Sequence, residues 1–115
     1  MKKGGIFCET YGTNARNIIL EHLLENQELD FAIGDVAKQT GISRPKAYEI
    51  IKEFEKKGII KKSRIISKTQ LYILNVSDNR VKLFVKDFKE CLRFAYEKKN
   101  HAAGSSAAMA YAKTA

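Results

Sequence analysis

The segment DVAKQTGISRPKAYEIIKEFEKKGII, residues 35–60, decides the fold of this chain. Asp35 is a good start for a short helix, and Gly41 follows it where a left-handed helix exit is cheap for glycine. Ser43 is a strong N-cap for a second helix, and Pro45 lies in its first turn, where a missing amide proton costs nothing. The segment therefore predicts two helices joined by a tight glycine turn.

The second helix carries the clearest periodicity in the chain. Its apolar residues recur at i, i+3, i+4 and i+7, which predicts a buried stripe made of Ala47, Ile50, Ile51 and Phe54. Gly58 is expected to end the helix. A turn of about 100° per residue leaves a polar and basic outer side, which holds Pro45, Lys46, Tyr48, Glu49 and Lys52, with Arg44 near the first turn.

The flanking sequence predicts a β-hairpin downstream and a further helix upstream. Residues 59–66 read as a strand with a basic middle, and residues 70–74 as its β-rich return strand after a short turn. Upstream, Thr13 or Asn14 can cap a helix that runs to about residue 25. A very short strand over residues 29–33 is the weakest of these predictions.

The expected fold class is mainly α with a small β-hairpin, in one domain with appendages. Residues 1–12 show no period and are expected to be a flexible lead-in, and residues 13–75 form the folded domain. Residues 80–99 form a long C-terminal helix, and the Ala-rich residues 100–115 are expected to be a flexible tail.

The net charge of +8 is concentrated in the middle of the chain. Residues 43–72 hold nine basic and three acidic side chains, whereas residues 1–42 hold four basic and six acidic ones. From Lys56 to Lys68 there are six cations and no acid. Such a block is typical of a surface that binds a polyanion, although a solvated face that only aids solubility has the same composition.

Residues 35–60 resemble the winged helix-turn-helix of archaeal and bacterial regulators related to the MarR and ArsR groups. The resemblance covers roughly residues 13–75. The matching features are Ala37, Gly41, Ser43, Tyr48, the apolar pair Ile50 and Ile51, and the end of the segment at residues 55–60. It implies a winged helix-turn-helix plus a long C-terminal helix. It also implies that the helix at residues 43–57 lies in the DNA major groove, while the hairpin, or wing, touches the backbone or minor groove.

Carried over to this chain, the resemblance gives two sets of candidate DNA contacts. The helix supplies Ser43, Arg44, Pro45, Lys46, Tyr48, Glu49 and Lys52. The wing supplies Arg64 and Lys68. Tyr48 can instead pack against the preceding helix, and Glu49 can instead pair with Lys46 or Lys52.

The long C-terminal helix has an apolar seam that suits a homodimer. Its spacing is a/d-like and gives the expected interface Val81, Phe84, Val85, Phe88, Cys91, Leu92 and Ala95. A single small winged helix can cover part of that seam, and a symmetric partner can cover the rest. The alternative is a helix folded back on its own domain.

The remaining residues predict neither an enzyme nor a metal, cofactor or membrane protein. His22 and His101 stand in no nucleophile or ligand pattern, and Cys8 and Cys91 have no CxxC spacing. No apolar run is long enough to span a membrane, and no signal peptide is indicated, so a cytoplasmic protein is expected. The sequence predicts a DNA-binding transcriptional regulator, with no evident effector pocket. The alternative function is a winged helix that binds proteins or RNA.

Overall fold

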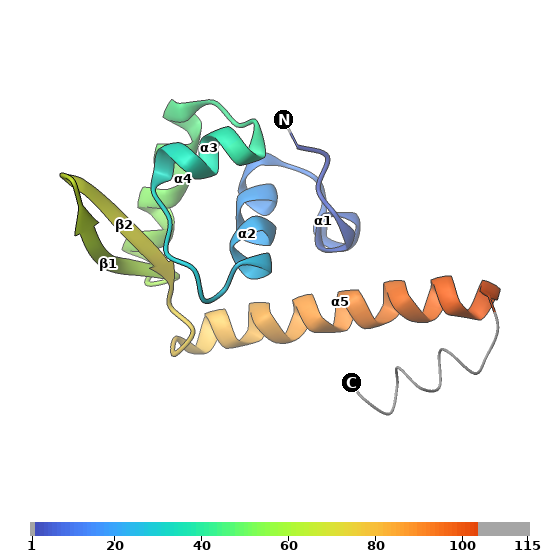
Figure 1. The fold of residues 1–115 in the computed structure, drawn as a ribbon. Coiled ribbons are helices and arrows are strands. Elements are labelled where there is room, and N and C mark those ends of the chain that lie inside the picture. Colours follow the sequence, from blue (N-terminus) through green and yellow to red (C-terminus); the bar gives the residue numbers. More distant parts are fainter. Residues whose placement is uncertain (1, 104–115) are drawn as a thin grey trace.

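The computed structural model describes the backbone of residues 2–103 and the side chains of residues 2–97. The order of elements within this range is α1 Ile6–Tyr11, α2 Ala15–Glu25, α3 Ile33–Thr40, α4 Arg44–Lys56, β1 Ile60–Ile66, β2 Thr69–Leu74 and α5 Asn79–Ala103. Figure 1 shows α2, α3 and α4 gathered together, the hairpin of β1 and β2 at one side, and α5 running past them. The predicted fold class, mainly α with a small hairpin and a long C-terminal helix, is confirmed.

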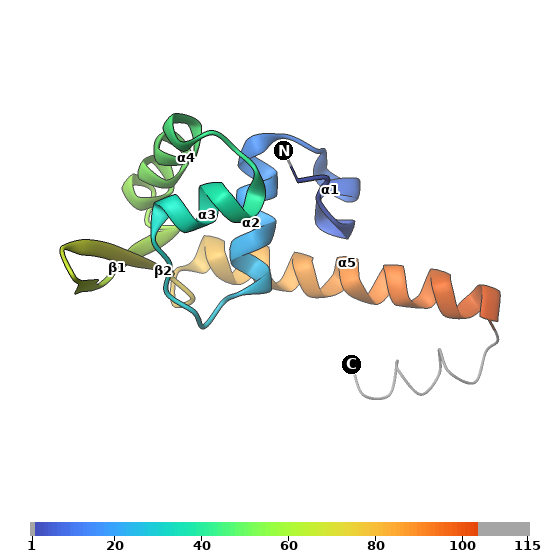
Figure 2. The same ribbon diagram turned by 45° about the horizontal axis from the view of Figure 1, so that its top comes forward.

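The core forms where α4 lies against α2 and α3. The predicted stripe of α4 is buried, and Ile51 and Phe54 have no exposed surface. From α2, Ile18 and Ile19 are equally buried in the same hydrophobic cluster. Because this stripe fixes the back of α4, the opposite side of that helix must face outward, as seen from a second angle in Figure 2.

The helix ends follow the expected chemistry. Gly41 has φ 71° and ψ 16°, the left-handed conformation that lets α3 turn directly into α4. Ser43 occupies the N-cap position of α4, although its side chain makes no capping hydrogen bond. Asn14 caps α2, where its Oδ1 accepts from the Asn17 amide at 2.9 Å. After α4, Gly58 has φ 78°, and the Ile59 amide donates to the Phe54 carbonyl.

The wing, defined here as β1, β2 and their turn, is a two-stranded antiparallel sheet. Its register pairs Ile60 with Leu74 and Ile65 with Gln70, with an irregularity between Lys62 and Ile65. The strand predicted over residues 29–33 is reduced to a single bridge, in which Phe31 and Tyr72 exchange both backbone hydrogen bonds at 2.8 Å. This bridge ties the wing to the segment that leads into α3.

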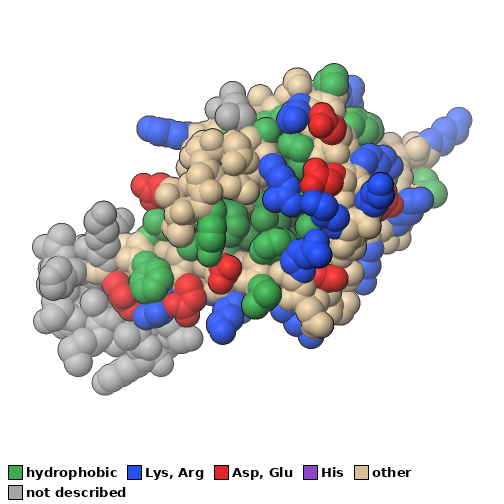
Figure 3. All heavy atoms as spheres, turned by 180° about the vertical axis from the view of Figure 1, so that it is seen from behind, with side chains coloured by type: hydrophobic (Ala, Val, Ile, Leu, Met, Phe, Trp, Pro, Cys, Tyr) green, Lys and Arg blue, Asp and Glu red, His purple; other side chains and the backbone are tan. Residues whose placement is uncertain are grey.

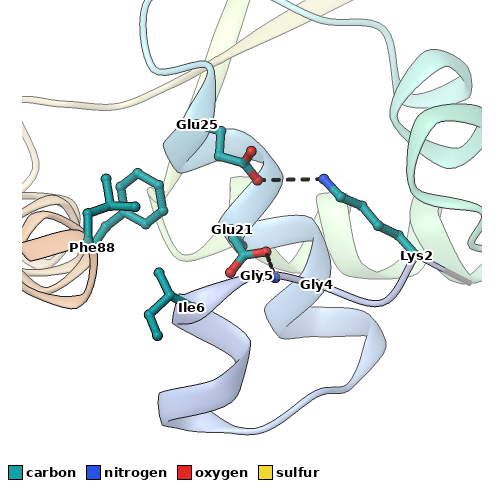
Figure 4. Close-up of a pocket in the computed structure, with 8 residues that line it drawn as sticks. Lys2, Gly4, Gly5, Ile6, Glu21, Glu25 and Phe88 are labelled. Atoms are coloured by element: carbon teal, nitrogen blue, oxygen red, sulfur yellow. Dashed lines mark hydrogen bonds and ion pairs between the residues drawn. The ribbon is translucent and has the colours of Figure 1, made fainter. Parts of the chain in front are cut away.

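The N-terminal residues correct one prediction. The sequence predicts a flexible lead-in over residues 1–12, but residues 6–11 form α1 and bury Phe7 and Cys8. The reason is Glu21 of α2, which is only 2% exposed. Its carboxylate accepts from the Gly5 amide at 2.6 Å and from the Cys8 amide at 3.1 Å, so it satisfies amides at the start of α1 (Figure 4).

The same N-terminal segment lines a hollow of about 480 Å³ beside α2 and α5. Ile6 and Phe88 face one another across it, from α1 and α5, and Lys2 pairs with Glu25 at 3.5 Å (Figure 4). The Lys2 amide also donates to the Thr40 carbonyl at the end of α3. The first residues therefore connect α3, α2 and α5.

Helix α5 packs along α1 and α2 and then projects past them (Figures 1 and 2). It is longer than the predicted 80–99, because residues 100–103 belong to it. The rest of the predicted tail, 104–115, lies outside the described residues. No helix within the described residues has the length and apolar composition needed to cross a membrane.

The packing of α5 buries part of the apolar seam predicted for a dimer and leaves another part exposed. Val81, Phe88 and Cys91 are buried within this chain, and Phe84 and Val85 pack partly against its core. Val81, Phe88 and Cys91 are therefore occupied within the chain, whereas Phe84 and Val85 keep part of their surface exposed. Of the predicted set, Leu92 is exposed and Ala95 is half-buried. The seam is therefore most exposed at Leu92, which lines the rim of the hollow beside the N-terminal segment.

Candidate nucleic-acid interface

The exposed side of α4 and its N-cap presents all of the helix residues predicted to contact DNA. Each of the seven is exposed to solvent: Ser43, Arg44, Pro45, Lys46, Tyr48, Glu49 and Lys52. Pro45 lies in the first turn, as predicted, so the lack of its amide proton breaks no helical bond. The buried stripe and the exposed set together give α4 one anchored side and one free side.

The start of α4 and the tip of the wing face a shared hollow of about 470 Å³. Arg44 and Tyr48 line it from α4, and Lys68 lines it from the turn of the wing. Thr69 and Gln70 complete this side from β2. The structure thus brings residues from both predicted contact sets to one face of the molecule.

A glycine gives Arg44 its place beside α3. A Cβ atom at Gly34 would lie 2.6 Å from Nη2 of Arg44, which shows how closely the guanidinium passes over the first turn of α3. Gly34 also lines the hollow.

Three α4 side chains predicted to contact DNA are held by neighbours. Lys46 and Glu49 form an ion pair at 3.6 Å, so the predicted alternative for Glu49 is observed. Lys52 donates to the Tyr72 hydroxyl at 2.8 Å, and this hydrogen bond raises the pKa of the lysine. Lys52 therefore joins α4 to β2.

Arg64, predicted as a wing contact with DNA, is exposed and is also paired with a neighbour. Its Nε donates to Asp30 Oδ2 at 2.8 Å, and Ser63 donates to the same oxygen at 3.0 Å. The bonds from Arg64 and Ser63 hold the pKa of the Asp30 carboxyl below its ordinary value, so the pair persists through neutral pH. Asp30 thus anchors β1 to the segment before α3, and Lys68 is the predicted wing residue that the hollow exposes.

Three contributors to this face have no recognisable signature in the sequence. Asp30 lies 34 residues from Arg64 in the sequence, and helix or strand periodicity does not connect residues that far apart. Thr69 is predicted only as part of the turn and Gln70 only as the start of the return strand, and their place beside Arg44 depends on the tertiary packing of the wing.

The charge on this side of the molecule is strongly positive. On the face drawn in Figure 3, Lys and Arg side chains gather over the half that holds α4 and the wing. Within the wing itself, Lys61, Lys62 and Lys68 are exposed. No acidic residue occurs between Lys56 and Asp78. A surface of this kind attracts the phosphates of a nucleic acid.

Replacing Lys68 should weaken binding to all duplexes alike. If Lys68 contacts one phosphate, Lys68→Ala makes the slope of log affinity against log salt shallower by about 0.9. Lys89→Ala removes the same charge from the exposed surface of α5 and serves as the control. The slopes are measured by fluorescence anisotropy. Equal slopes for wild type and both variants would show that Lys68 does not contact the DNA.

The arrangement of α3, the Gly41 turn, α4 and a two-stranded wing defines a winged helix-turn-helix. The family model "Sugar-specific transcriptional regulator TrmB" matches residues 19–77, and the chain belongs to that family of transcriptional regulators. The matched residues run from α2 to the segment after the wing, so the match concerns the helix-turn-helix and the wing. No curated protein matches the chain significantly.

Solved structures of other proteins have the same winged helix-turn-helix fold. MepR, a transcription regulator of the Staphylococcus aureus multidrug efflux pump MepA, has a TM-score of 0.59 at 19% identity, covering 92% of this chain and 76% of MepR. The adhesin competence repressor AdcR from Streptococcus pyogenes has a TM-score of 0.60 at 13% identity, covering 95% of this chain and 82% of AdcR. A point mutant of S. aureus MepR bound to an oligodeoxyribonucleotide has a TM-score of 0.56 at 15% identity, covering 93% of this chain and 77% of the mutant. The predicted resemblance to winged-helix regulators is confirmed.

Proposed function

We propose that this chain binds double-stranded DNA sequence-specifically and regulates transcription as a homodimer. One observation carries the proposal: the basic start of α4 and the tip of the wing line the same hollow. A major groove about 12 Å wide admits one helix, and the wing then lies beside the adjoining backbone. Membership of a transcriptional-regulator family supports this function.

Within this proposal, the residues of α4 have different tasks. Arg44 and Lys46 are long, exposed cations in the first turn, the part of a recognition helix that reaches base edges. Tyr48 lies one turn further along and is exposed, so it can contact a thymine methyl or a sugar. Ser43 and Pro45 lie close to the backbone of the helix start, where amides attract phosphate.

The second half of α5 supplies the homodimer contact. Leu92 and Phe94 are exposed there, at 43% and 58%. Large exposed apolar side chains on a projecting helix favour a partner that removes them from water. A two-fold pairing through this segment would present two copies of α4 to one duplex, and the operator would then be a rough palindrome. A regulator of this kind works in the cytoplasm, where its DNA is.

The test is a competition between nucleic acids. Binding of the full chain to duplex DNA, duplex RNA and single strands is measured over a range of salt concentrations. The proposal requires tighter binding to duplex DNA and a steep loss of affinity with salt. Equal binding to duplex RNA, or no binding to any nucleic acid, would instead favour an RNA-binding or protein-binding winged helix.

A further inference from the structure

The wing carries an unusual pair of exposed apolar side chains near its tip. Ile65 is 68% exposed and Ile66 is 46% exposed, although both have strong preferences for buried positions. At these exposures a large part of each side chain is left in contact with water. They lie directly before the turn that bears Lys68, the wing cation that lines the hollow.

The two isoleucines lie on opposite faces of the wing, because successive strand residues alternate in direction. Ile65 pairs with Gln70, and cross-strand partners share a face. The same face continues to Tyr72, and both Gln70 and Tyr72 line the hollow beside Arg44. Ile66 pairs with Thr69 on the other face of the wing. Thr69 also lines the hollow, but Leu71, the next residue on that face, does not. Ile65 is therefore the isoleucine on the side of α4.

The hairpin holds Ile65 in a fixed place. Ser67 and Lys68 both have positive φ, 46° and 69°, which is the conformation of a tight two-residue hairpin turn. On the other side of Ile65, Arg64 and Ser63 are bonded to Asp30. Arg64 directly precedes Ile65, and its ion pair with Asp30 draws its guanidinium toward the segment before α3.

The surroundings of Ile65 indicate what covers it. Lys61, Lys62 and Lys68 are the exposed lysines of the wing, and no acidic residue lies between them in the sequence. A second wing of the same charge would be repelled, whereas a polyanion with an apolar recess would be attracted. The DNA minor groove has this combination, since phosphates line its edges and sugars and base edges form its walls and floor.

We propose that Ile65 enters the DNA minor groove beside the site read by α4 and selects A·T base pairs there. The proposal rests on the proposed function, because it requires a duplex bound to α4. The guanine amino group stands in the minor groove and is absent from A·T pairs, so an apolar side chain packs closely only on A·T sequence. Apolar wedges of this type also widen the groove and bend the duplex.

The experiment compares Ile65→Ala with the matched variant Ile66→Ala. The duplex is the sequence that the wild-type protein enriches from a random pool, with the flanks outside the enriched core set to A·T or to G·C pairs. Wild type and Ile66→Ala should prefer the A·T flanks by roughly tenfold, and Ile65→Ala should lose most of this preference. Its affinity for the G·C-flanked duplex should stay within about twofold of wild type.

Each other result contradicts the proposal in a recognisable way. If Ile65→Ala keeps the A·T preference, or both variants lose it equally, Ile65 does not read the minor groove. If Ile65→Ala changes the sedimentation coefficient, its face is a contact between copies of the chain. If the wild type enriches no sequence and binds no duplex, the proposed function fails together with this inference.

Discussion

The double variant Arg44→Ala, Lys46→Ala is expected to lose sequence-specific binding by at least about 30-fold. A good base contact from a side chain of this kind contributes about 1–3 kcal/mol of discrimination, and each 1.4 kcal/mol is about tenfold in affinity. Both residues are exposed in the first turn of α4, and neither belongs to the buried stripe, so the fold should survive. Freeing Glu49 from its pair with Lys46 adds repulsion of the DNA.

The measurement is affinity for a preferred duplex and for a random duplex, with each protein at the same salt concentration. Lys86→Ala, Lys89→Ala removes two exposed charges from α5 and is the matched control. The double variant should lose much more on the preferred duplex than on the random one. An equal loss on both would mean that Arg44 and Lys46 bind only phosphates, and the assignment of α4 as the base-reading helix would be wrong.

The second large effect is expected from α5. Leu92→Glu, Phe94→Glu places two charges on the second half of α5, where each side chain is already exposed in the single chain. The variant should therefore remain folded but become monomeric. A monomer engages one half of a palindromic operator, and the loss of the linked second contact should cost about 10²–10⁴-fold in affinity.

Phe88→Glu would be a poorer test of the same idea. Phe88 is only 8% exposed and belongs to the core of its own chain, so a charge there would unfold the domain as well as any dimer. Val76→Glu, which changes an exposed apolar residue outside α5, is the proper control. Sedimentation and circular dichroism report oligomeric state and fold. A wild type that sediments as a monomer at tens of micromolar would contradict the homodimer.

Local patterns predict the helix-turn-helix because its determinants are close in sequence. The stripe of α4 repeats within one helix, and Gly41 and Gly58 end helices through their own backbone conformations. The exposed side of α4 follows from the same periodicity, since burying one side of a helix exposes the other.

Contacts between distant residues cannot be predicted in this way. Helix α1 forms on the Glu21 carboxylate of a neighbouring helix, and the wing is anchored by Asp30. The spacing on α5 correctly predicts an apolar seam, but periodicity does not tell whether a helix stripe meets its own domain or a partner. The burial of Val81 and Phe88 within the chain depends on where α1 and α2 lie.

Selection of bound duplexes from a random pool tests the central claim most directly. The wild-type chain is incubated with the pool at physiological salt, and the bound fraction is sequenced after successive rounds. The account predicts one enriched motif, a rough palindrome whose half-sites lie about one helical turn, 34–36 Å, or a multiple of it apart. A pool that shows no enriched motif, although the protein retains duplex at low salt, would contradict sequence-specific recognition by α4.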